Sequence, residues 1–159
     1  MMTMLKKLIS TTLTASATLV VLLGSSNALA APVCTLDVGV SEAMAFSTKN
    51  IDVPKACKEF TINLKVAGTM PKAVMGHNLV ISKTADLQPV VDDGNKVGLA
   101  GNYVKAKDAR VVVATKVIGG GEKTTSKFKV SKLNAKDSYM FYCSFPGHSG
   151  MMKGTVKLV

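Results

Sequence analysis

The chain has no tryptophan, only two histidines and three cysteines, and charged residues make up just 19% of its 159 residues. Low charge together with a hydrophobic content of 47% excludes a disordered chain and indicates a folded globular protein. The length excludes tandem domains and solenoids, and we find no internal repeat, low-complexity tract or linker. A single domain therefore accounts for the chain once an N-terminal leader is set apart.

Acidic residues are scarce, with 10 Asp and Glu set against 20 Lys and Arg. The formal net charge is +10, and Lys6 and Lys7 of the leader contribute two of these charges, which leaves +8 for the remainder. The lysines are scattered through most of the predicted strands, as is typical of a solvated outer face. We expect no binding of nucleic acid, and partners that carry an acidic patch.

Long hydrophobic runs are absent beyond the leader, so no later segment could span a bilayer. Residues 1–30 have the features of a secretory signal peptide: Lys6 and Lys7, an apolar stretch around 19–23, and Ala28-Leu29-Ala30 as a cleavage site. The apolar stretch is interrupted by Thr and Ser and is too short for a membrane anchor. We predict export and cleavage after Ala30, which leaves residues 31–159 as one mature domain without a membrane anchor.

Three cysteines in an exported chain leave one without a disulfide partner. Cys34 and Cys57 lie near the start of the mature domain, whereas Cys143 lies near its end. We expect a Cys34–Cys57 disulfide and a free Cys143 thiol, although the sequence alone leaves the other pairings open. Such a bridge closes a loop of about 24 residues and would stabilise the fold by roughly 3 kcal/mol in the chain-entropy treatment.

Alternating hydrophobicity dominates the mature domain. Phe60, Ile62 and Leu64 alternate with polar residues, which predicts a strand with one face on a core and one in water. Eight such segments separated by Gly and Pro turns predict an all-β, eight-stranded Greek-key β-sandwich or barrel. The segment 84–107 does not alternate cleanly, and we expect an insertion outside the sandwich with a short helix. The predicted strands are Cys34–Val40, Phe46–Asp52, Cys57–Ala67, Asn78–Ser82, Arg110–Lys116, Lys123–Val130, Ser138–Cys143 and Lys153–Val159.

Both histidines lie in unusual surroundings. Cys143, His148 and Met152 fall within ten residues around a Pro-Gly turn, and His77 lies far upstream. One thiolate, two imidazoles and a weak thioether are the ligand set of a blue-copper electron-transfer site. Each residue alone has a commoner structural role, since a free cysteine or a methionine is usually core filler and a histidine is usually structural or exposed. Because all four fit one site, we predict a centre for one copper ion.

Four stretches around these residues resemble a known family: Met-Gly-His-Asn at 75–78, Tyr-Met-Phe-Tyr-Cys at 139–143, Phe-Pro-Gly-His-Ser at 145–149 and Met-Lys-Gly-Thr at 152–155. They are similar to the azurins, which are bacterial periplasmic cupredoxins, and the likeness covers essentially the whole mature domain. Plastocyanin and pseudoazurin share the Cys, His and Met pattern, but the early cysteine pair and the Met-Gly-His-Asn stretch favour the azurins. The resemblance implies a cupredoxin-like fold and a periplasmic electron carrier that cycles between Cu(I) and Cu(II).

The resemblance also implies a role for each residue of the site. His77, Cys143 and His148 would bind copper in a plane, with Met152 as a long axial ligand and the backbone carbonyl of Gly76 opposite it. These five residues are the metal ligands that the resemblance predicts.

A second set of residues would support the ligands or receive partners. The Asn78 side chain would tie the two ligand-bearing loops together, with Ser144 beside it, and the backbone amides of Asn78 and Phe145 would donate to the cysteine sulfur. The resemblance implies a monomer that exchanges electrons with c-type cytochromes or a periplasmic reductase across an apolar surface near His148. That surface would be formed by Met44, Met70, Pro71, Val74, Met75, Phe145, Pro146 and Met151.

The chain departs from the family in two respects. It lacks the buried tryptophan that is common there, and Leu79 follows Asn78 where an aromatic residue is expected. It also lacks the additional core histidine of many azurins, so the pH-linked behaviour attributed to that histidine is not implied here. Neither difference affects the predicted fold or copper site.

Two other functions fit the residues less well. Cys143 could be an enzyme nucleophile with a histidine as its base. That hypothesis gives Met152 no role, and no carboxylate within residues 143–152 could orient the imidazole. We therefore expect no enzyme. A copper chaperone or scavenger is the alternative that the sequence leaves open, and it would require an accessible site that releases its metal.

Overall fold

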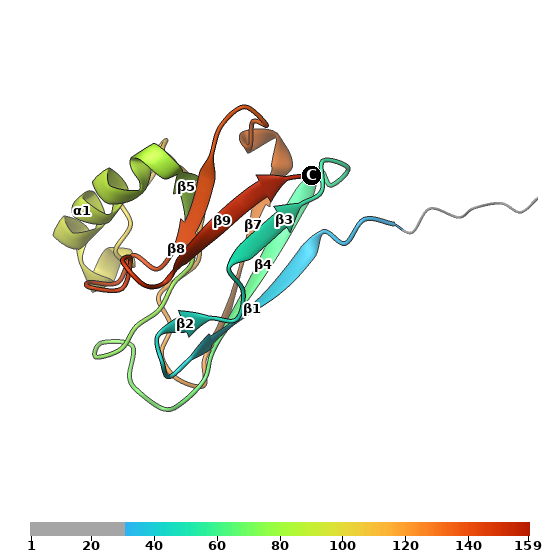
Figure 1. The fold of residues 1–159 in the computed structure, drawn as a ribbon. Coiled ribbons are helices and arrows are strands. Elements are labelled where there is room, and N and C mark those ends of the chain that lie inside the picture. The colour runs from blue at the N-terminus through green and yellow to red at the C-terminus, as the bar shows by residue number, and fades with distance from the viewer. Residues whose placement is uncertain (1–30) are drawn as a thin grey trace, which may run out of the picture. The chain divides into compact units, whose positions relative to one another are not determined.

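The structure of the protein is a computed structural model, which describes residues 31–159; the predicted signal peptide of residues 1–30 lies outside the described residues. Over residues 31–159 the chain forms nine strands in two sheets, with one α-helix set beside them (Figure 1). The strands are β1 (Thr35–Ser41), β2 (Ala45–Phe46), β3 (Asn50–Val53), β4 (Glu59–Val66), β5 (Val80–Lys83), β6 (Val111–Ala114), β7 (Lys123–Lys129), β8 (Tyr139–Tyr142) and β9 (Lys153–Leu158).

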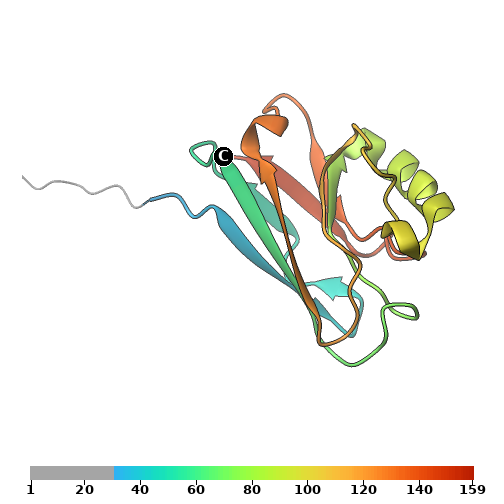
Figure 2. The same cartoon turned by 180° about the vertical axis from the view of Figure 1, so that it is seen from behind.

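The two sheets face each other as a β-sandwich, which confirms the predicted all-β fold class (Figures 1 and 2). One sheet has the strand order β2-β1-β4-β7, and the other has the order β3-β9-β8-β5-β6. Most neighbours pair antiparallel, but β1 pairs with β4 and β3 pairs with β9 in parallel. The chain crosses to the other sheet between the two strands of each parallel pair, because β3 separates β1 from β4 in sequence and β4 separates β3 from β9.

The core lies between the sheets and follows the alternation of the sequence. In β4, Phe60, Ile62 and Leu64 are buried while the residues between them face outward. Each such side chain contributes about 1.5 to 3 kcal/mol when it leaves water. One aromatic pair joins the two layers, with the ring centroids of Phe46 and Phe141 5.3 Å apart.

The segment 46–52, which the sequence predicts as a single strand, is divided between the two sheets. β2 ends at Phe46 and pairs with β1, whereas β3 begins at Asn50 and pairs with β9. Thr48 lies in the gap, where its hydroxyl donates to the Asn50 carbonyl (2.7 Å) and accepts from the Asn50 amide (3.2 Å). These local bonds replace ladder bonds and let the chain change sheets. The prediction of eight strands is therefore corrected to nine over the described residues.

The insertion contains the expected helix. It consists of a 3-10 turn η1 (Thr84–Asp86), helix α1 (Leu87–Val97) and a 3-10 turn η2 (Leu99–Gly101). Val90 and Val91 of the helix pack on Val80 and Tyr142 of the sheet and form a small core separate from the main one.

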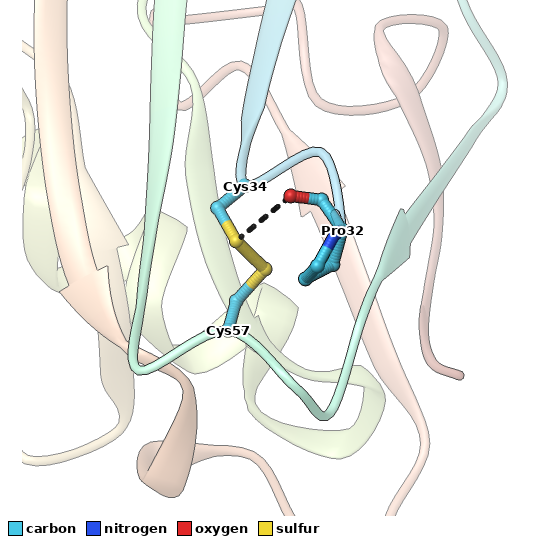
Figure 3. Close-up of a disulfide and its surroundings, with 3 residues drawn as sticks. All are labelled: Pro32, Cys34 and Cys57. Atoms are coloured by element: carbon cyan, nitrogen blue, oxygen red, sulfur yellow. Dashed lines mark hydrogen bonds between the residues drawn. A yellow bond between two sulfur atoms is a disulfide. The ribbon is translucent and has the colours of Figure 1, made fainter. Parts of the chain in front are cut away.

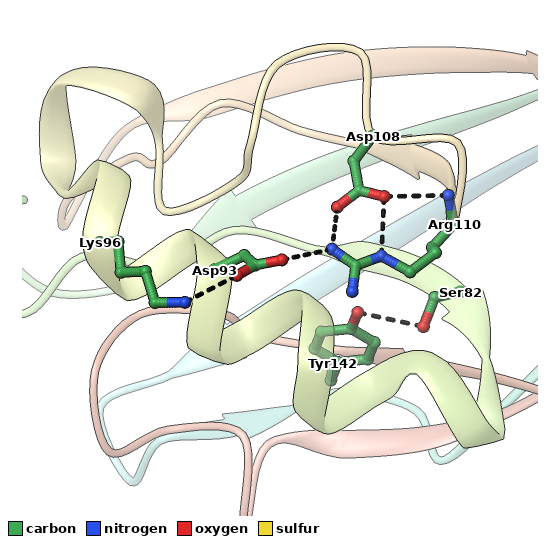
Figure 4. Close-up of polar contacts among 6 residues, drawn as sticks. All are labelled: Ser82, Asp93, Lys96, Asp108, Arg110 and Tyr142. Carbon is green, nitrogen blue, oxygen red and sulfur yellow. Dashed lines mark hydrogen bonds and ion pairs between the residues drawn. The ribbon is translucent and has the colours of Figure 1, made fainter.

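Charged side chains fasten this insertion to the body of the protein (Figure 4). Arg110, just before β6, donates to Asp108 at 2.6 Å and to Asp93 of α1 at 2.7 Å, and Lys96 donates to Asp93 at 2.9 Å. Hydrogen bonds from Arg110 and then Lys96 lower the pKa of the Asp93 carboxyl to about 2. The helix is thus held by the packing of its apolar face on the sheet and by the ion pairs of Asp93.

The expected disulfide joins Cys34 to Cys57, with their Cα atoms 5.7 Å apart (Figure 3). It links the residue before β1 to the segment before β4, at one end of the sandwich. Cys143 is the free cysteine of the described residues, and it is buried. No helix within residues 31–159 is long and apolar enough to cross a membrane.

Candidate metal centre

Two separate segments bring the predicted ligands together. His77 lies before β5 and forms an isolated bridge with Ile118, each backbone amide donating to the other residue's carbonyl at 2.9 Å. Cys143 directly follows β8, and Met152 directly precedes β9. The Cys143 amide donates to the Met152 carbonyl at 3.0 Å, and the Met152 amide donates to the His148 carbonyl at 2.8 Å. Two adjacent strands therefore close the loop that carries three of the predicted ligands.

The side chains of His77, Cys143 and His148 converge on one point. Their ligand atoms all lie within 4.8 Å of one another, and the Cys143 sulfur is 3.6 Å from Nδ1 of His148. The two imidazole rings have centroids 4.9 Å apart. His148 keeps 6% of its surface exposed, whereas Cys143 and Met152 are fully enclosed. A single ion could therefore contact the thiol and both imidazoles within a closed pocket.

Burial sets the protonation of these groups. Desolvation lowers the pKa of His77 to about 4, and the neighbouring His148 contributes to this lowering. Desolvation also lowers the pKa of His148 and raises the pKa of the Cys143 thiol to about 11. At neutral pH both imidazoles are thus neutral and able to donate a lone pair, and metal binding would displace the thiol proton.

The site fits a soft or borderline metal ion. Within residues 31–159, Nδ1 of His77 is the one buried side-chain nitrogen or oxygen without a hydrogen-bond partner. An unpaired buried nitrogen is costly unless something else occupies its lone pair. The backbone amides of Asn78 and Phe145 point at the Cys143 sulfur and favour its thiolate form. A thiolate with two imidazoles suits copper, and a bound copper ion would occupy the unpaired nitrogen.

Gly76 lies where the site leaves no room for a side chain. A Cβ atom at this position would clash with the Lys72 carbonyl and with the side chains of Val117 and Phe145. The absence of a side chain lets the His77 segment lie close against the Cys143 loop.

Asn78 joins the two ligand-bearing segments. Its Nδ2 donates to the Ser144 hydroxyl at 2.8 Å, and its Oδ1 accepts from the Ser144 amide at 2.9 Å. Both residues are fully buried, so these bonds have no competition from water. These bonds thus join the two segments that carry the predicted ligands, because Asn78 follows His77 in the chain and Ser144 follows Cys143.

The structure adds supporting residues that sequence reasoning missed. The Thr115 hydroxyl accepts from the Leu79 amide at 2.9 Å. Asn102 of the insertion accepts from the Asn78 side chain at 3.0 Å through its backbone carbonyl, and from the Val117 amide at 2.8 Å through its side chain. The sequence had no sign of these contacts, because the residues lie 15 to 36 positions from their partners.

The residues predicted to form the apolar docking surface differ in exposure. Met70, Val74 and Met151 are 47%, 60% and 59% exposed, and Pro71 and Pro146 are also exposed. The remaining members are covered to a greater extent: Met44 packs against the core, Met75 is half-buried and Phe145 is buried.

Comparison with known proteins identifies one family over nearly all of the described residues. Residues 32–159 match the family model for copper binding proteins of the plastocyanin/azurin family. The azurin of Pseudomonas denitrificans is 56% identical over 125 residues, which cover 79% of this chain and 98% of that protein. The azurin of Bordetella pertussis is 52% identical over 136 residues, which cover 83% of this chain and 91% of that protein.

A solved structure has the same fold. The azurin Az-iso2 from the obligate methylotroph Methylomonas sp. strain J superposes with a TM-score of 0.77 at 46% sequence identity, covering 80% of this chain and 99% of that one. The family model gives copper as the cofactor, and the cluster of His77, Cys143 and His148 could hold one metal ion. The matching family and the azurin names of the relatives are those of copper-binding proteins and not of enzymes. The chain belongs to the plastocyanin/azurin family of copper-binding proteins.

Proposed function

We propose that this protein is a blue-copper electron carrier that holds one copper ion and moves single electrons between redox proteins of the periplasm. His77, Cys143 and His148 would hold the ion, with Met152 and the Gly76 carbonyl as further ligands. The observation that carries the proposal is the buried convergence of one thiol and two neutral imidazoles, with Nδ1 of His77 left unpaired. Such a ligand set tolerates both Cu(I) and Cu(II).

The burial and backbone hydrogen bonding of the proposed ligands favour an electron carrier over a chaperone. His77, Cys143 and Met152 are 2%, 0% and 0% exposed, and their backbones are bonded to other segments. Ligands that barely move let the ion change charge with little rearrangement, whereas a chaperone needs a site from which metal escapes readily. The rigid, enclosed centre is therefore suited to holding copper while electrons pass.

The surface near His148 is suited to brief contact with partners. Of the four side-chain ligands, His148 is the most exposed, and the exposed Met70, Val74 and Met151 supply apolar area for a docking face. The mature net charge of +8 would steer partners that carry an acidic patch, such as c-type cytochromes or a periplasmic reductase. We propose that the protein acts as an exported monomer.

Redox titration combined with copper exchange tests this function against the alternative. We expect one copper ion per chain, a reversible one-electron titration and slow copper loss to a competing chelator in both oxidation states. Rapid exchange of copper to the chelator would instead support a chaperone or scavenger. A bound ion that cannot be reduced and reoxidised would refute the carrier function.

A further inference from the structure

The turn after η2 has an uncommon backbone. Asn102 and Tyr103 both have positive φ, at 59° and 52°. This left-handed region is tolerated by asparagine but is uncommon for a bulky side chain such as tyrosine. Backbone bonds hold the turn in place, since the Asn102 amide donates to the Leu99 carbonyl and the Tyr103 amide to the Gly98 carbonyl, both at 2.9 Å. Two successive residues in this conformation need a specific structural reason.

Asn102 uses this conformation to hold two segments at once. Its side-chain Oδ1 accepts from the Val117 amide at 2.8 Å, and its backbone carbonyl accepts from Nδ2 of Asn78 at 3.0 Å. Val117 precedes Ile118, which pairs with His77 through two backbone bonds. The same Asn78 nitrogen donates to the Ser144 hydroxyl at 2.8 Å. One residue is therefore linked to His77 on one side and to the neighbour of Cys143 on the other.

Tyr103 adds an aromatic contact from the same turn. Its ring meets Phe145 edge to face, with centroids 5.1 Å apart and an angle of 70° between the planes. Phe145 in turn packs on His148 at 4.8 Å between centroids, and its amide points at the Cys143 sulfur. The turn thus touches both sides of the site, by hydrogen bonds through Asn102 and by ring packing through Tyr103.

Helix α1 leaves room for the turn at one residue. A Cβ atom on Gly94 would clash with the backbone carbonyl of Tyr103. Alanine is normally the better helix former by about 1 kcal/mol, so glycine in this position has a packing reason rather than a helical one. The helix and the turn are therefore fitted to each other.

We propose that Asn102 is a positioning residue of the metal centre. It fixes the distance between the His77 and Cys143 segments by bonding Val117 and Asn78 from a single left-handed backbone position. The inserted segment would then be part of the metal site rather than an appendage of the sandwich. This inference rests on the proposed copper function for its redox consequences, but its effect on the metal-free protein does not depend on copper.

Three substitutions of Asn102 distinguish the effect of its side-chain acceptor from the effect of its backbone conformation. Asn102→Ala removes the acceptor and disfavours positive φ, Asn102→Gly removes the acceptor but permits positive φ, and Asn102→Asp keeps the acceptor and tolerates positive φ. Asn63→Ala is the matched control, because Asn63 also has two side-chain partners, Asp37 and Thr125 at 2.8 Å each, but on the outer face of a sheet.

Amide hydrogen exchange of the metal-free protein gives the first measurement. The Val117 amide loses its partner directly, so its exchange is not informative. We expect the amides of His77, Ile118 and Ser144 to exchange about tenfold faster in the alanine and glycine variants of Asn102, and at near wild-type rates in the aspartate variant. Unchanged exchange of these three amides in the glycine variant would overturn the proposal, whether or not the alanine variant folds.

The copper-loaded protein gives the second measurement. In the alanine and glycine variants we expect copper loss to a chelator to be about tenfold faster than in wild type, as for other residues that orient metal ligands. A tenfold change in the ratio of Cu(II) to Cu(I) affinities corresponds to about 59 mV in the reduction potential. The aspartate variant should restore slow copper loss. Rates and potentials equal to those of Asn63→Ala would overturn the proposal, whereas a wild-type protein that does not bind copper would refute the proposed function instead.

Gly94→Ala perturbs the same turn through a side chain on helix α1. The added methyl must displace the Tyr103 carbonyl, so this variant should speed copper loss in the same direction as Asn102→Gly. The two substitutions combined should have less than the summed effect, because both release the same turn. Fully additive effects, or slower copper loss in Gly94→Ala, would contradict the proposed coupling.

Discussion

Asn78→Leu tests the bridge between the two ligand-bearing segments in the metal-free protein. The substitution roughly preserves side-chain size but removes both partners of Ser144, whose amide and hydroxyl are fully buried. Each buried group left without a partner costs about 1 to 3 kcal/mol, so the free energy of unfolding should fall by about 2 to 6 kcal/mol. For a domain of this size, that lowers the melting temperature by at least about 8 °C.

Urea unfolding of the metal-free variants measures this cost. The control is Asn63→Leu, whose lost bonds to Asp37 and Thr125 lie on the outer face where water can replace them. The control should cost about 1 kcal/mol or less. Adding Ser144→Ala to Asn78→Leu removes the orphaned hydroxyl and should recover about 1 kcal/mol relative to additivity. Equal costs for the two leucine variants would refute the claim that the Asn78 bridge stabilises the fold.

Three further predictions concern other parts of the molecule. Replacing Cys34 and Cys57 by alanine should lower the free energy of unfolding by about 3 kcal/mol in urea, and an unchanged midpoint would contradict this. Because the pKa of Asp93 is held near 2, below the ordinary 3.8, its stabilisation is complete above about pH 4 and is lost as the pH falls toward 2. Asp93→Asn should therefore flatten that part of the acid-unfolding curve, and an unaltered curve would count against the network. Met151→Lys should slow electron self-exchange without changing the spectrum, whereas Val33→Lys, at the disulfide end, should not; equal rates would remove the apolar docking surface.

Local patterns in the sequence were sufficient to predict most of the fold. The alternation of Phe60, Ile62 and Leu64 matches their burial in β4, because a strand that covers a core must turn every second residue inward. The helix in the insertion was predictable from the loss of that alternation. The break at Thr48 was not predictable, since a threonine that bonds its own neighbours looks the same in sequence as one that faces solvent from a strand.

Part of the candidate metal site was likewise predictable from the sequence, and part was not. His77, Cys143, His148 and Met152 could be predicted as ligands because one thiol, two imidazoles and a thioether together match the ligand set of a single type of metal centre. Asn102 could not, because its contribution depends on a positive φ and on a backbone carbonyl, and neither leaves a mark in the amino-acid sequence. Residues that act through the backbone are therefore the part of a metal site that needs a structure.

The visible absorption spectrum of the oxidised, copper-loaded protein tests the central claim most directly. A copper–thiolate bond gives an intense blue band, so wild type and Met152→Leu should both be blue, the latter with a changed reduction potential, while Cys143→Ser should be nearly colourless at one copper per chain. The matched serine keeps the approximate size of the side chain and replaces only the sulfur. A colourless wild-type protein after copper loading, or an intensely blue Cys143→Ser protein, would contradict the assignment of this site.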